Sequence, residues 1–501
     1  MKLPQLPLRS IGACVALLAV ISFLGLEPPG PERERLAAGT AESAGSEDFV
    51  AEDAAAADPT GAAGGAAAES GGASGAAGGA QGTGAAQGAK AGAGAGAAAG
   101  SGATAGAKSN LRCAAGANGG ATDKGVTGNR IKLAATNVRS GVGSSFLGTS
   151  YIGMQAVVNR VNAKGGICGR LLDLRLVDDG WEAARGANYI QNFAKDNYFA
   201  LPVVPSSEGL TQAISIGTID AAGIPVVGSD GMLKEQYDNA WVWPVATSTV
   251  STMRVMVKHA ADKGAKTFGI VFDQQYRFGK EGAAAFKAYV RGLTGADPKA
   301  FVGITPGRAN YSGDAKKFND DCGGDGCDFV AMLLDPTTAN TYISSQVDKD
   351  GRRQGFGRVV TGGAQPLFNE RFARDCGVSC EGMLVWTGYN PPIGALQSRP
   401  SVTAYMDDVR SVDPGVDVAN QFLEGAYLGM QVFVAALEKA GPNLTRAGVR
   451  AAMDSMTYTS DLSSPLTWGP RQRFANQTAQ AFRIVTASGS FAGFAEEGTG
   501  F

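Results

Sequence analysis

From residue 130 onward, short apolar segments alternate with longer segments in which apolar residues recur every three or four positions. The short segments are typical of buried strands and the longer ones of amphipathic helices. Strands are expected at residues 130–138, 171–177, 199–204, 224–228, 267–272, 301–305, 329–334 and 358–361. Helices are expected between them, including residues 144–163, 250–263 and 279–293. This alternation predicts an α/β fold with parallel sheets and helices on both faces.

The stretch WVWPVATS, residues 241–248, interrupts this alternation and is interpreted as a crossover between domains. Near the carboxyl end, residues 420–440 carry a long apolar stripe. The stripe is typical of a core helix, and a partner-binding face is the less favoured alternative. Short strand signals at 466–468 and 482–485 are expected to rejoin an earlier sheet.

The first 112 residues have a different composition. Residues 1–36 contain the uncharged apolar run 11–26, which spans roughly 24 Å as a helix and fits either a secretory signal peptide or a short signal anchor. Residues 37–112 are almost entirely Ala, Gly, Ser, Thr and Gln, so we expect a disordered linker. Both features indicate an extracytoplasmic protein, either secreted or held at the cell surface.

The remaining chain, from residue 113 to about 494, is long enough for two domains. The formal net charge is −2 and no basic stripe is present, so a nucleic-acid partner is not expected.

Six cysteines follow the apolar run. Four of them form the close pairs Cys322–Cys327 and Cys376–Cys380, which leaves Cys113 to pair with Cys168. Export favours disulfides. The alternative is a zinc site built from the two close pairs, whose spacing also fits metal binding.

Polar corners follow two consecutive strands of the first half. Ser206 and Ser207 begin a helix after one strand, and Gly228, Ser229 and Asp230 follow the next. A serine in such a place caps a helix. Two polar corners in succession also fit a ligand site, because ligands bind at the carboxyl ends of parallel strands and helix starts attract anions.

The first two strand ends offer weaker candidates. Ser144 follows a glycine loop that matches the dinucleotide fingerprint only in part, so it is either a helix cap or a ligand contact. Asp178 and Asp179 fit a turn with a cap, a metal site or catalytic acids. Trp181 either covers an apolar ligand or packs in the core.

In the second half, Tyr276 and Phe278 follow the strand at 267–272, and Asp335 and Gln365 follow two later strands. Asp335 either meets a ligand ammonium group or begins a helix before a proline.

Support for catalysis is poor. His259 is the one histidine and falls within an expected helix, and no P-loop, nucleophile elbow or histidine metal motif is present. We therefore expect no enzyme activity, no cofactor and no metal.

The segments GVTGNRIKLA, GMQAVVNRVNAKGGICGRLLDLRLVDDG, VVPSS and FDQQYRFGKEG resemble the type I periplasmic binding proteins. The resemblance covers roughly residues 125–494 and is nearest to the branched-chain amino acid (Leu/Ile/Val) receptors of ABC importers. It implies two Rossmann-like lobes joined by three crossovers. Lobe one would comprise residues 113–246 plus 385–461, and lobe two residues 247–384 plus 462–494.

The resemblance also implies site residues. Ser206, Ser207 and the loop from Gly228 to Asp230 match the family's carboxylate-binding corners. Phe278 stands where the family has a cleft-closing tyrosine, with Tyr276 two residues earlier. The acid that holds the ligand ammonium in amino acid receptors is replaced by the TGGAQ segment, so Asp335 or Asp230 would have to supply that charge.

Three functions stay open. The first is a monomeric receptor that binds a small polar solute (an amino acid, an amide or a related acid) and delivers it to an ABC permease. The second is a sensor that signals to a membrane partner without transport. The third is an extracytoplasmic enzyme that uses Asp178, Asp179 or Asp230.

Overall fold

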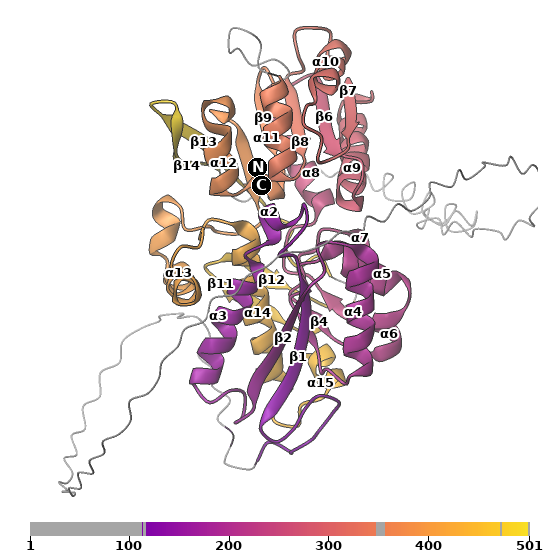
Figure 1. The fold of residues 1–501 in the computed structure, drawn as a ribbon, viewed down its shortest axis with the longest axis vertical. Coiled ribbons are helices and arrows are strands. Elements are labelled where there is room, and N and C mark those ends of the chain that lie inside the picture. Colours follow the sequence, from indigo (N-terminus) through magenta and orange to yellow (C-terminus); the bar gives the residue numbers. More distant parts are fainter. Residues whose placement is uncertain (1–112, 114–116, 347–355, 471–472, 499–501) are drawn as a thin grey trace, which may run out of the picture. The chain divides into compact units, whose positions relative to one another are not determined.

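The computed structural model describes residues 113, 117–346, 356–470 and 473–498. They form two α/β lobes, each built around its own largely parallel sheet (Figure 1). The apolar run at 11–26 and the linker at 37–112 lie outside the described residues. Within the described ranges, no helix is both long enough and apolar enough to cross a membrane.

The first lobe contains a parallel sheet in the order β2-β1-β3-β4-β5, in which a single bridge between Leu133 and Ala200 joins β1 to β3. Its strands are β1 (Arg130–Asn137), β2 (Leu171–Asp178), β3 (Leu201–Pro202), β4 (Val226–Val227) and β5 (Val242–Trp243). A small antiparallel hairpin of β11 (Thr457–Ser460) and β12 (Ser463–Thr467) belongs to the same lobe.

Helices cover both faces of this sheet, with α4, α5 and α6 on one side and α3 and α14 on the other (Figure 1). The helices of the lobe are α2 (Ser144–Leu147), α3 (Ser150–Ala163), α4 (Ala183–Lys195), α5 (Ser207–Ser215), α6 (Thr218–Ala222), α7 (Lys234–Asp238), α13 (Pro400–Val412), α14 (Gln421–Ala440) and α15 (Arg446–Met453).

The long helix α14 lies in the core, as its apolar stripe predicts. Asn420 caps its start, because the side-chain oxygen accepts hydrogen bonds from the N–H groups of Phe422 and Leu423 at 2.9 and 3.2 Å. Halfway along, Gly429 packs directly on Gly228 at the end of β4, and a Cβ on either glycine would lie within 3 Å of the other's backbone. The backbone of Gly228 is therefore packed closely against a helix of its own lobe.

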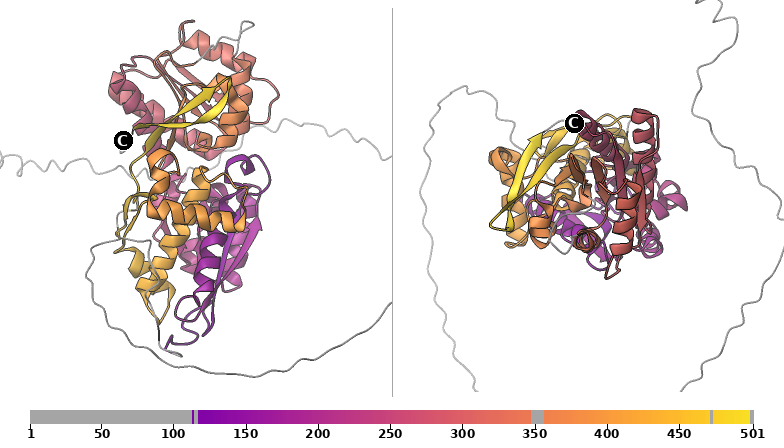
Figure 2. Two further views of the ribbon diagram at one scale, coloured as in Figure 1. Left: turned by 90° about the vertical axis from the view of Figure 1, so that its left-hand side faces the viewer. Right: turned by 90° about the horizontal axis from the view of Figure 1, so that it is seen from above.

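The second lobe has a seven-stranded sheet in the order β14-β13-β10-β9-β8-β6-β7. Its strands are β6 (Phe268–Asp273), β7 (Ala300–Ile304), β8 (Phe329–Leu333), β9 (Val360–Gly363), β10 (Leu384–Thr387), β13 (Gln480–Ala487) and β14 (Ser490–Gly498). The strand signal at 482–485 rejoins this sheet as β13, which pairs antiparallel with β10. Figure 2 shows the β13–β14 hairpin in yellow beside the other strands of the lobe.

Alternate residues of β8 point to opposite faces of this sheet, as the period of two in a strand requires. Phe329 and Leu333 pack in the layer of α8 and α9, whereas Val330 and Met332 pack toward α10, α11 and α12. The helices are α8 (Thr249–Asp262), α9 (Arg277–Thr294), α10 (Ser312–Asp321), α11 (Pro336–Ser345) and α12 (Glu370–Cys376), with short 3-10 turns η1 (Gln365–Leu367), η2 (Gly377–Cys380) and η3 (Gly394–Ser398).

The chain passes between the lobes three times, and hydrogen bonds join the crossing segments. Thr247 forms a parallel bridge with Asn476, and the Asn476 amide donates to the carbonyl oxygen of Gly388 at 2.7 Å. The crossings follow β5, follow β10 and precede β13. These three segments form the hinge.

The predicted lobe boundaries differ from the structure in two places. β10 pairs with β9 and β13, so residues 385–387 belong to the second lobe. Leu462, Leu466 and Trp468 pack in the core of the first lobe, so the last crossing comes near Asn476 and not at 461. The stretch at 241–248, predicted as a crossover alone, also contributes the edge strand β5.

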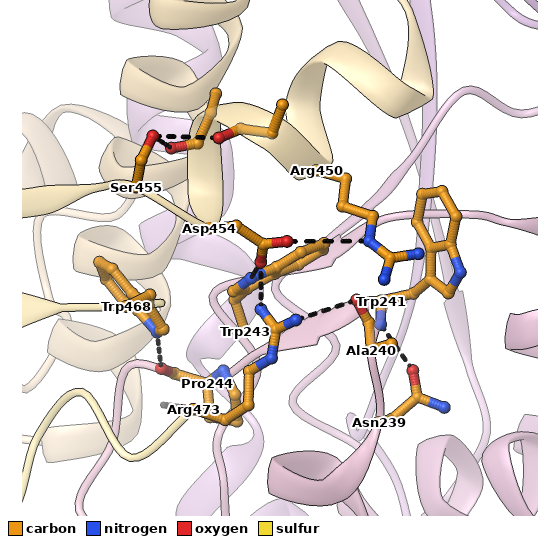
Figure 3. A network of polar contacts seen from close by, with 12 residues as sticks. Asn239, Ala240, Trp241, Trp243, Pro244, Arg450, Asp454, Ser455, Trp468 and Arg473 are labelled. Atoms are coloured by element: carbon orange, nitrogen blue, oxygen red, sulfur yellow. Dashed lines mark hydrogen bonds and ion pairs between the residues drawn. The ribbon is translucent and has the colours of Figure 1, made fainter. Parts of the chain in front are cut away.

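A buried network secures the segment before the last crossing (Figure 3). The Arg473 guanidinium pairs with Asp454, the residue after α15, at 2.7 Å, donates to the Ala240 carbonyl at 3.2 Å and lies over the ring of Trp243 at 4.8 Å. The indole N–H of Trp468 donates to the Pro244 carbonyl at 3.1 Å. The network therefore ties this segment to β5, which precedes the first crossing.

Two predicted helices are each divided. The helix expected at 144–163 breaks between α2 and α3, and the helix expected between the strands at 199–204 and 224–228 breaks at Gly217, whose φ of 75° is left-handed. The helices α7 and α13 have no counterpart in the prediction.

The three predicted disulfides are confirmed as Cys113–Cys168, Cys322–Cys327 and Cys376–Cys380. The zinc alternative is wrong, because a disulfide sulfur carries no thiolate to bind a metal. In the described ranges, no group of three or more His, Cys, Asp or Glu side chains is placed to hold a metal ion.

Candidate functional site

The strand ends of the two lobes meet through an aromatic cluster. Trp181, three residues past the end of β2, stacks on Tyr276 of the other lobe with ring centroids 4.5 Å apart, and it also contacts Phe278 at 5.5 Å. Phe146 packs on the edge of Trp181 at 5.3 Å. Trp181 is 1% exposed and has a left-handed φ of 65°, which is uncommon for a bulky residue. Of the two alternatives for Trp181, the structure therefore shows core packing, at the contact between the lobes.

Phe278 is fully buried in the first turn of α9. Tyr276 precedes that helix and is partly exposed. Tyr276, more than Phe278, is therefore the aromatic residue of this loop that meets the first lobe face to face.

The two serines at the start of α5 have different surroundings, and neither hydroxyl caps the helix. Ser207 accepts a hydrogen bond from the indole N–H of Trp181 at 3.3 Å and lies 3.8 Å from the sulfur of Met232. Ser206 lies beside the buried carboxyl group of Asp179, within the first lobe. The capping prediction is therefore wrong for both serines, and Ser207 is the one that reaches the aromatic cluster.

Glu208, the next residue, connects the lobes. Its Oε1 accepts a hydrogen bond from the backbone N–H of Arg277 at 2.9 Å, at the first residue of α9. Glu208 is 7% exposed, and burial raises the pKa of its carboxyl group, while the Arg277 N–H and charge oppose that rise. Glu208 is not among the predicted site residues, because a glutamate in a first helical turn is ordinarily a favourable partner of its own helix.

Asp230 lies in the loop between β4 and α7. Its Oδ1 accepts from the Met232 N–H at 3.3 Å and from the Gln236 side-chain amide at 3.1 Å, while its buried Oδ2 has no hydrogen-bond partner. Burial raises the pKa of Asp230 to about 7, and the charge of Glu208 adds to the rise. The hydroxyl of the neighbouring Ser229 is also buried without a partner.

The second lobe presents two strand-end carboxylates. Asp335 caps α11, because its Oδ1 accepts from the N–H groups of Thr337 and Thr338 at 3.0 and 3.1 Å, so the helix-start interpretation is confirmed. Asp273, at the end of β6, accepts from the N–H groups of Gln275 and Tyr276 at 2.8 and 3.1 Å. Burial raises the pKa of Asp273 to about 6, with contributions from the charges of Asp335 and Glu208. Asp273 could have been predicted from the segment FDQQY, because it stands at the carboxyl end of a strand, where ligands bind in parallel sheets.

Gln365 lies at the hinge. Its side-chain amide donates to the Thr247 carbonyl at 2.9 Å, and its Oε1 is buried without a hydrogen-bond partner. Two adjoining cavities of about 10 Å³ each lie on the first-lobe side of this contact. Cavity A is lined by residues that include Asp230, Thr247, Gln365, Gly388, Tyr389 and Gln421. Cavity B shares Asp230, Tyr389 and Phe422 with cavity A and is otherwise lined mainly by apolar residues and glycines. Each cavity has room for about one water-sized group.

Ser144 lies apart from Asp230. Its hydroxyl donates to the Gly141 carbonyl at 2.7 Å, and it lines a more open cavity of about 420 Å³ with Thr337 and Asn340 of α11 and Asn369. A cavity of about 690 Å³ beside α10 contains none of the predicted site residues.

Two of the three aspartates considered as catalytic acids, Asp178 and Asp179, have structural roles. Asp178 Oδ1 accepts from the N–H groups of Arg139 and Gly180 at 2.9 and 3.1 Å, which confirms the turn interpretation. Asp179 accepts from the Trp181 N–H at 2.9 Å and is fully buried between α4 and α5. Neither carboxylate lines cavity A or cavity B.

A sequence profile described as "Periplasmic binding protein" matches residues 130–490, which is most of the chain. The chain belongs to the periplasmic binding protein family. The resemblance to the type I members is thereby confirmed, and membership implies an extracytoplasmic location. No curated protein sequence matches this periplasmic binding protein significantly.

Solved structures share the fold. A possible leucine/isoleucine/valine-binding protein from Rhodopirellula baltica SH 1 matches with a TM-score of 0.62 at 17% identity, covering 74% of this chain and 97% of that one. A fatty acid ABC transporter substrate-binding protein from Thermomonospora curvata gives 0.64 at 16% identity, with coverages of 76% and 94%. An ABC transporter solute-binding protein from R. palustris in complex with 4-hydroxybenzoate gives 0.62 at 17% identity, with coverages of 74% and 97%. At these identities the likeness shows the fold alone.

Proposed function

We propose that this periplasmic binding protein captures a small polar solute between its lobes and delivers it to an ABC permease. The observation that carries the proposal is the meeting of Ser207, Trp181 and Glu208 of one lobe with Tyr276 and Arg277 of the other. Side chains that contact each other across a hinge give a solute two surfaces to bind, and only closure brings both into contact with it.

The site residues we propose are Ser207, Ser229, Asp230, Tyr276 and Gln365. The family supports solute capture, since the similar structures include proteins described as substrate-binding components of ABC transporters. We propose that the protein acts as a monomer and is not an enzyme. A sensor would close on its ligand in the same way, so transport of the bound solute by vesicles that contain the permease distinguishes the two functions.

Trp181 supplies the assay for solute capture. Its indole stacks on Tyr276 across the lobes, so a solute that changes this contact is expected to change the emission of Trp181. The protein is titrated with amino acids, amides and short-chain acids, and Trp181→Phe is titrated in parallel to identify the signal. The double variant Ser207→Ala/Ser229→Ala is expected to weaken binding at least tenfold without unfolding. Unchanged affinity of the double variant in calorimetry would reject this site.

A further inference from the structure

Three of the side chains that line cavity A have acceptor atoms that receive no hydrogen bond from the described residues. Asp230 Oδ2, Gln365 Oε1 and Gln421 Oε1 are buried and have no hydrogen-bond partner, and the three residues are at most 9% exposed. The orientation of Gln365 is determined by its donation to the Thr247 carbonyl. Buried polar atoms in native proteins are nearly always hydrogen-bonded. Three acceptors around one water-sized space therefore fit a small group that carries several donors.

The charged groups that act most strongly on Asp230 and Asp273 are acidic. The leading charged neighbour of Asp230 is Glu208, and the leading charged neighbours of Asp273 are Asp335 and Glu208. Each of these carboxylates is at most 9% exposed. Buried carboxylates without a cation are costly unless a positive group joins them.

Two cationic side chains of this region, Arg277 and Lys234, form ion pairs elsewhere. The Arg277 guanidinium pairs with Glu235 and is 43% exposed, and Lys234 pairs with Asp238 and is 67% exposed. Neither side chain lines cavity A or cavity B. Among the buried carboxylates, Glu208 interacts with the charges of Arg277 and Lys280, whereas no cation is a leading influence on Asp230 or Asp273.

Aromatic rings complete the surroundings. Tyr389 and Phe422 line both cavities, and Tyr276 lies close enough to Asp273, Asp335 and Glu208 for their charges to raise the pKa of its hydroxyl, which burial raises most. The faces of aromatic rings attract cations. The charges of Asp230 and Glu208 would repel a carboxylate ligand.

We propose that the solute is an organic cation, whose ammonium group occupies cavity A and donates to Asp230 and Gln365. The adjoining cavity B, with its apolar lining, accepts the first carbon atoms of the ligand. This inference rests on the proposed function, since it names the class of solute that the interlobe site takes. An ammonium group is close in size to a water molecule and carries the donors that the acceptors of cavity A need.

The test uses probes that differ only in their ionic groups. Ethylammonium, propionate and alanine form one matched set, and 3-methylbutylammonium, 4-methylpentanoate and leucine form a larger one. Each probe is titrated into the full chain by calorimetry at pH 8 and constant ionic strength. The ammonium probes are expected to bind and the carboxylates are not. Asp230→Asn is expected to lose at least tenfold in affinity, because the charge-assisted hydrogen bond is lost.

Two further variants serve as a control and as a second test of the site. Asp238→Asn removes an exposed carboxylate of the nearby helix α7 and is expected to bind like the wild type. Gln365→Met removes the second acceptor at similar size, and it tests the site if Asp230→Asn does not fold. An unchanged ammonium affinity in both Asp230→Asn and Gln365→Met would overturn the placement in cavity A.

The outcomes separate this inference from the proposed function. If the amino acids or the carboxylates bind and the ammonium probes do not, the organic cation is wrong and solute capture stands. If no probe binds, native mass spectrometry of the protein isolated from its source decides. If native mass spectrometry finds a neutral or anionic solute, the proposal of an organic cation is wrong and solute capture stands. If neither calorimetry nor native mass spectrometry detects a bound solute, the result counts against both proposals.

Discussion

Glu208 of α5 accepts a hydrogen bond from the backbone N–H of Arg277, 2.9 Å away at the first residue of α9 in the other lobe. A carboxylate at a helix start satisfies an N–H group that has no partner within the helix and interacts favourably with the helix dipole. The first lobe therefore caps a helix of the second, and the contact exists only while the lobes are together.

The contact predicts how the lobes respond to its loss. Glu208→Ala removes the acceptor, so we expect a more open protein in the absence of added solute, seen as a larger radius of gyration by small-angle X-ray scattering. Glu208→Gln keeps an acceptor oxygen without the charge and is expected to lie between wild type and Glu208→Ala. Glu182→Gln changes an exposed carboxylate at the start of α4 and serves as the control. Identical scattering from all four proteins would show that Glu208 does not hold the lobes together.

The raised pKa of Asp230 predicts an uncommon dependence of stability on pH. With a pKa of about 7 in the folded state and 3.8 as the ordinary value, the folded state holds a proton that the unfolded state releases between about pH 4 and pH 7. The free energy of unfolding therefore falls as the pH rises through this range, by on the order of a few kcal/mol. Above about pH 7 Asp230 is ionised in both states and contributes no further change with pH. Asp273, with a pKa of about 6, acts in the same direction.

This prediction is checked by urea unfolding at pH 5 and pH 7.5. The difference between the two pH values is expected to shrink in Asp230→Asn, whose side chain does not titrate. Burial lowers the pKa of His259, which makes stability rise with pH over part of the range, but His259 is the same in both proteins and cancels in the comparison. An equal pH dependence in wild type and variant would contradict the raised pKa.

Arg473 is predicted to matter for stability because its ion pair is buried. Its side chain is 7% exposed, and Arg473→Met would leave the Asp454 carboxylate with the indole N–H of Trp243 at 3.2 Å and, as its one remaining cationic partner among the described residues, the more distant Arg450 at 3.8 Å. We expect a loss of about 3 kcal/mol in the free energy of unfolding, as is usual when one partner of a buried pair is removed. Arg371→Met is the matched control, because Arg371 is 85% exposed and its pair with Asp375 spans 3.7 Å. Comparable losses in the two variants would mean that burial of the Arg473 pair has no effect.

Alanine substitutions at Gly228 and Gly217 separate the effect of steric contact on stability from the effect of backbone strain. Both have a left-handed φ, 88° and 75°, so alanine is strained at either position. A Cβ at Gly228 would also lie 2.6 Å from the Cα of Gly429 in α14, whereas a Cβ at Gly217 meets nothing within 4 Å. Gly217→Ala is expected to cost about 1 kcal/mol. Gly228→Ala is expected to be several times more destabilising in thermal unfolding, and equal effects would show that β4 and α14 can move apart.

The sequence by itself determined the features that depend on local patterns. The alternation of apolar runs and amphipathic segments specifies the α/β elements, because burial imposes a period of two on strands and 3.6 on helices. The disulfide pairs also followed from the sequence, because the two close pairs have little chain to close and leave only Cys113 and Cys168.

Only the tertiary structure decided what each strand-end residue does. Ser206 and Ser207 are adjacent in the sequence, yet one hydroxyl lies beside Asp179 within a lobe and the other meets Trp181 at the contact between lobes. Glu208 reaches Arg277, 69 residues further along the chain, and Gln421 of α14 reaches the same cavity as Asp230. These meetings depend on how two lobes close about a hinge, and no local pattern in the sequence carries that geometry.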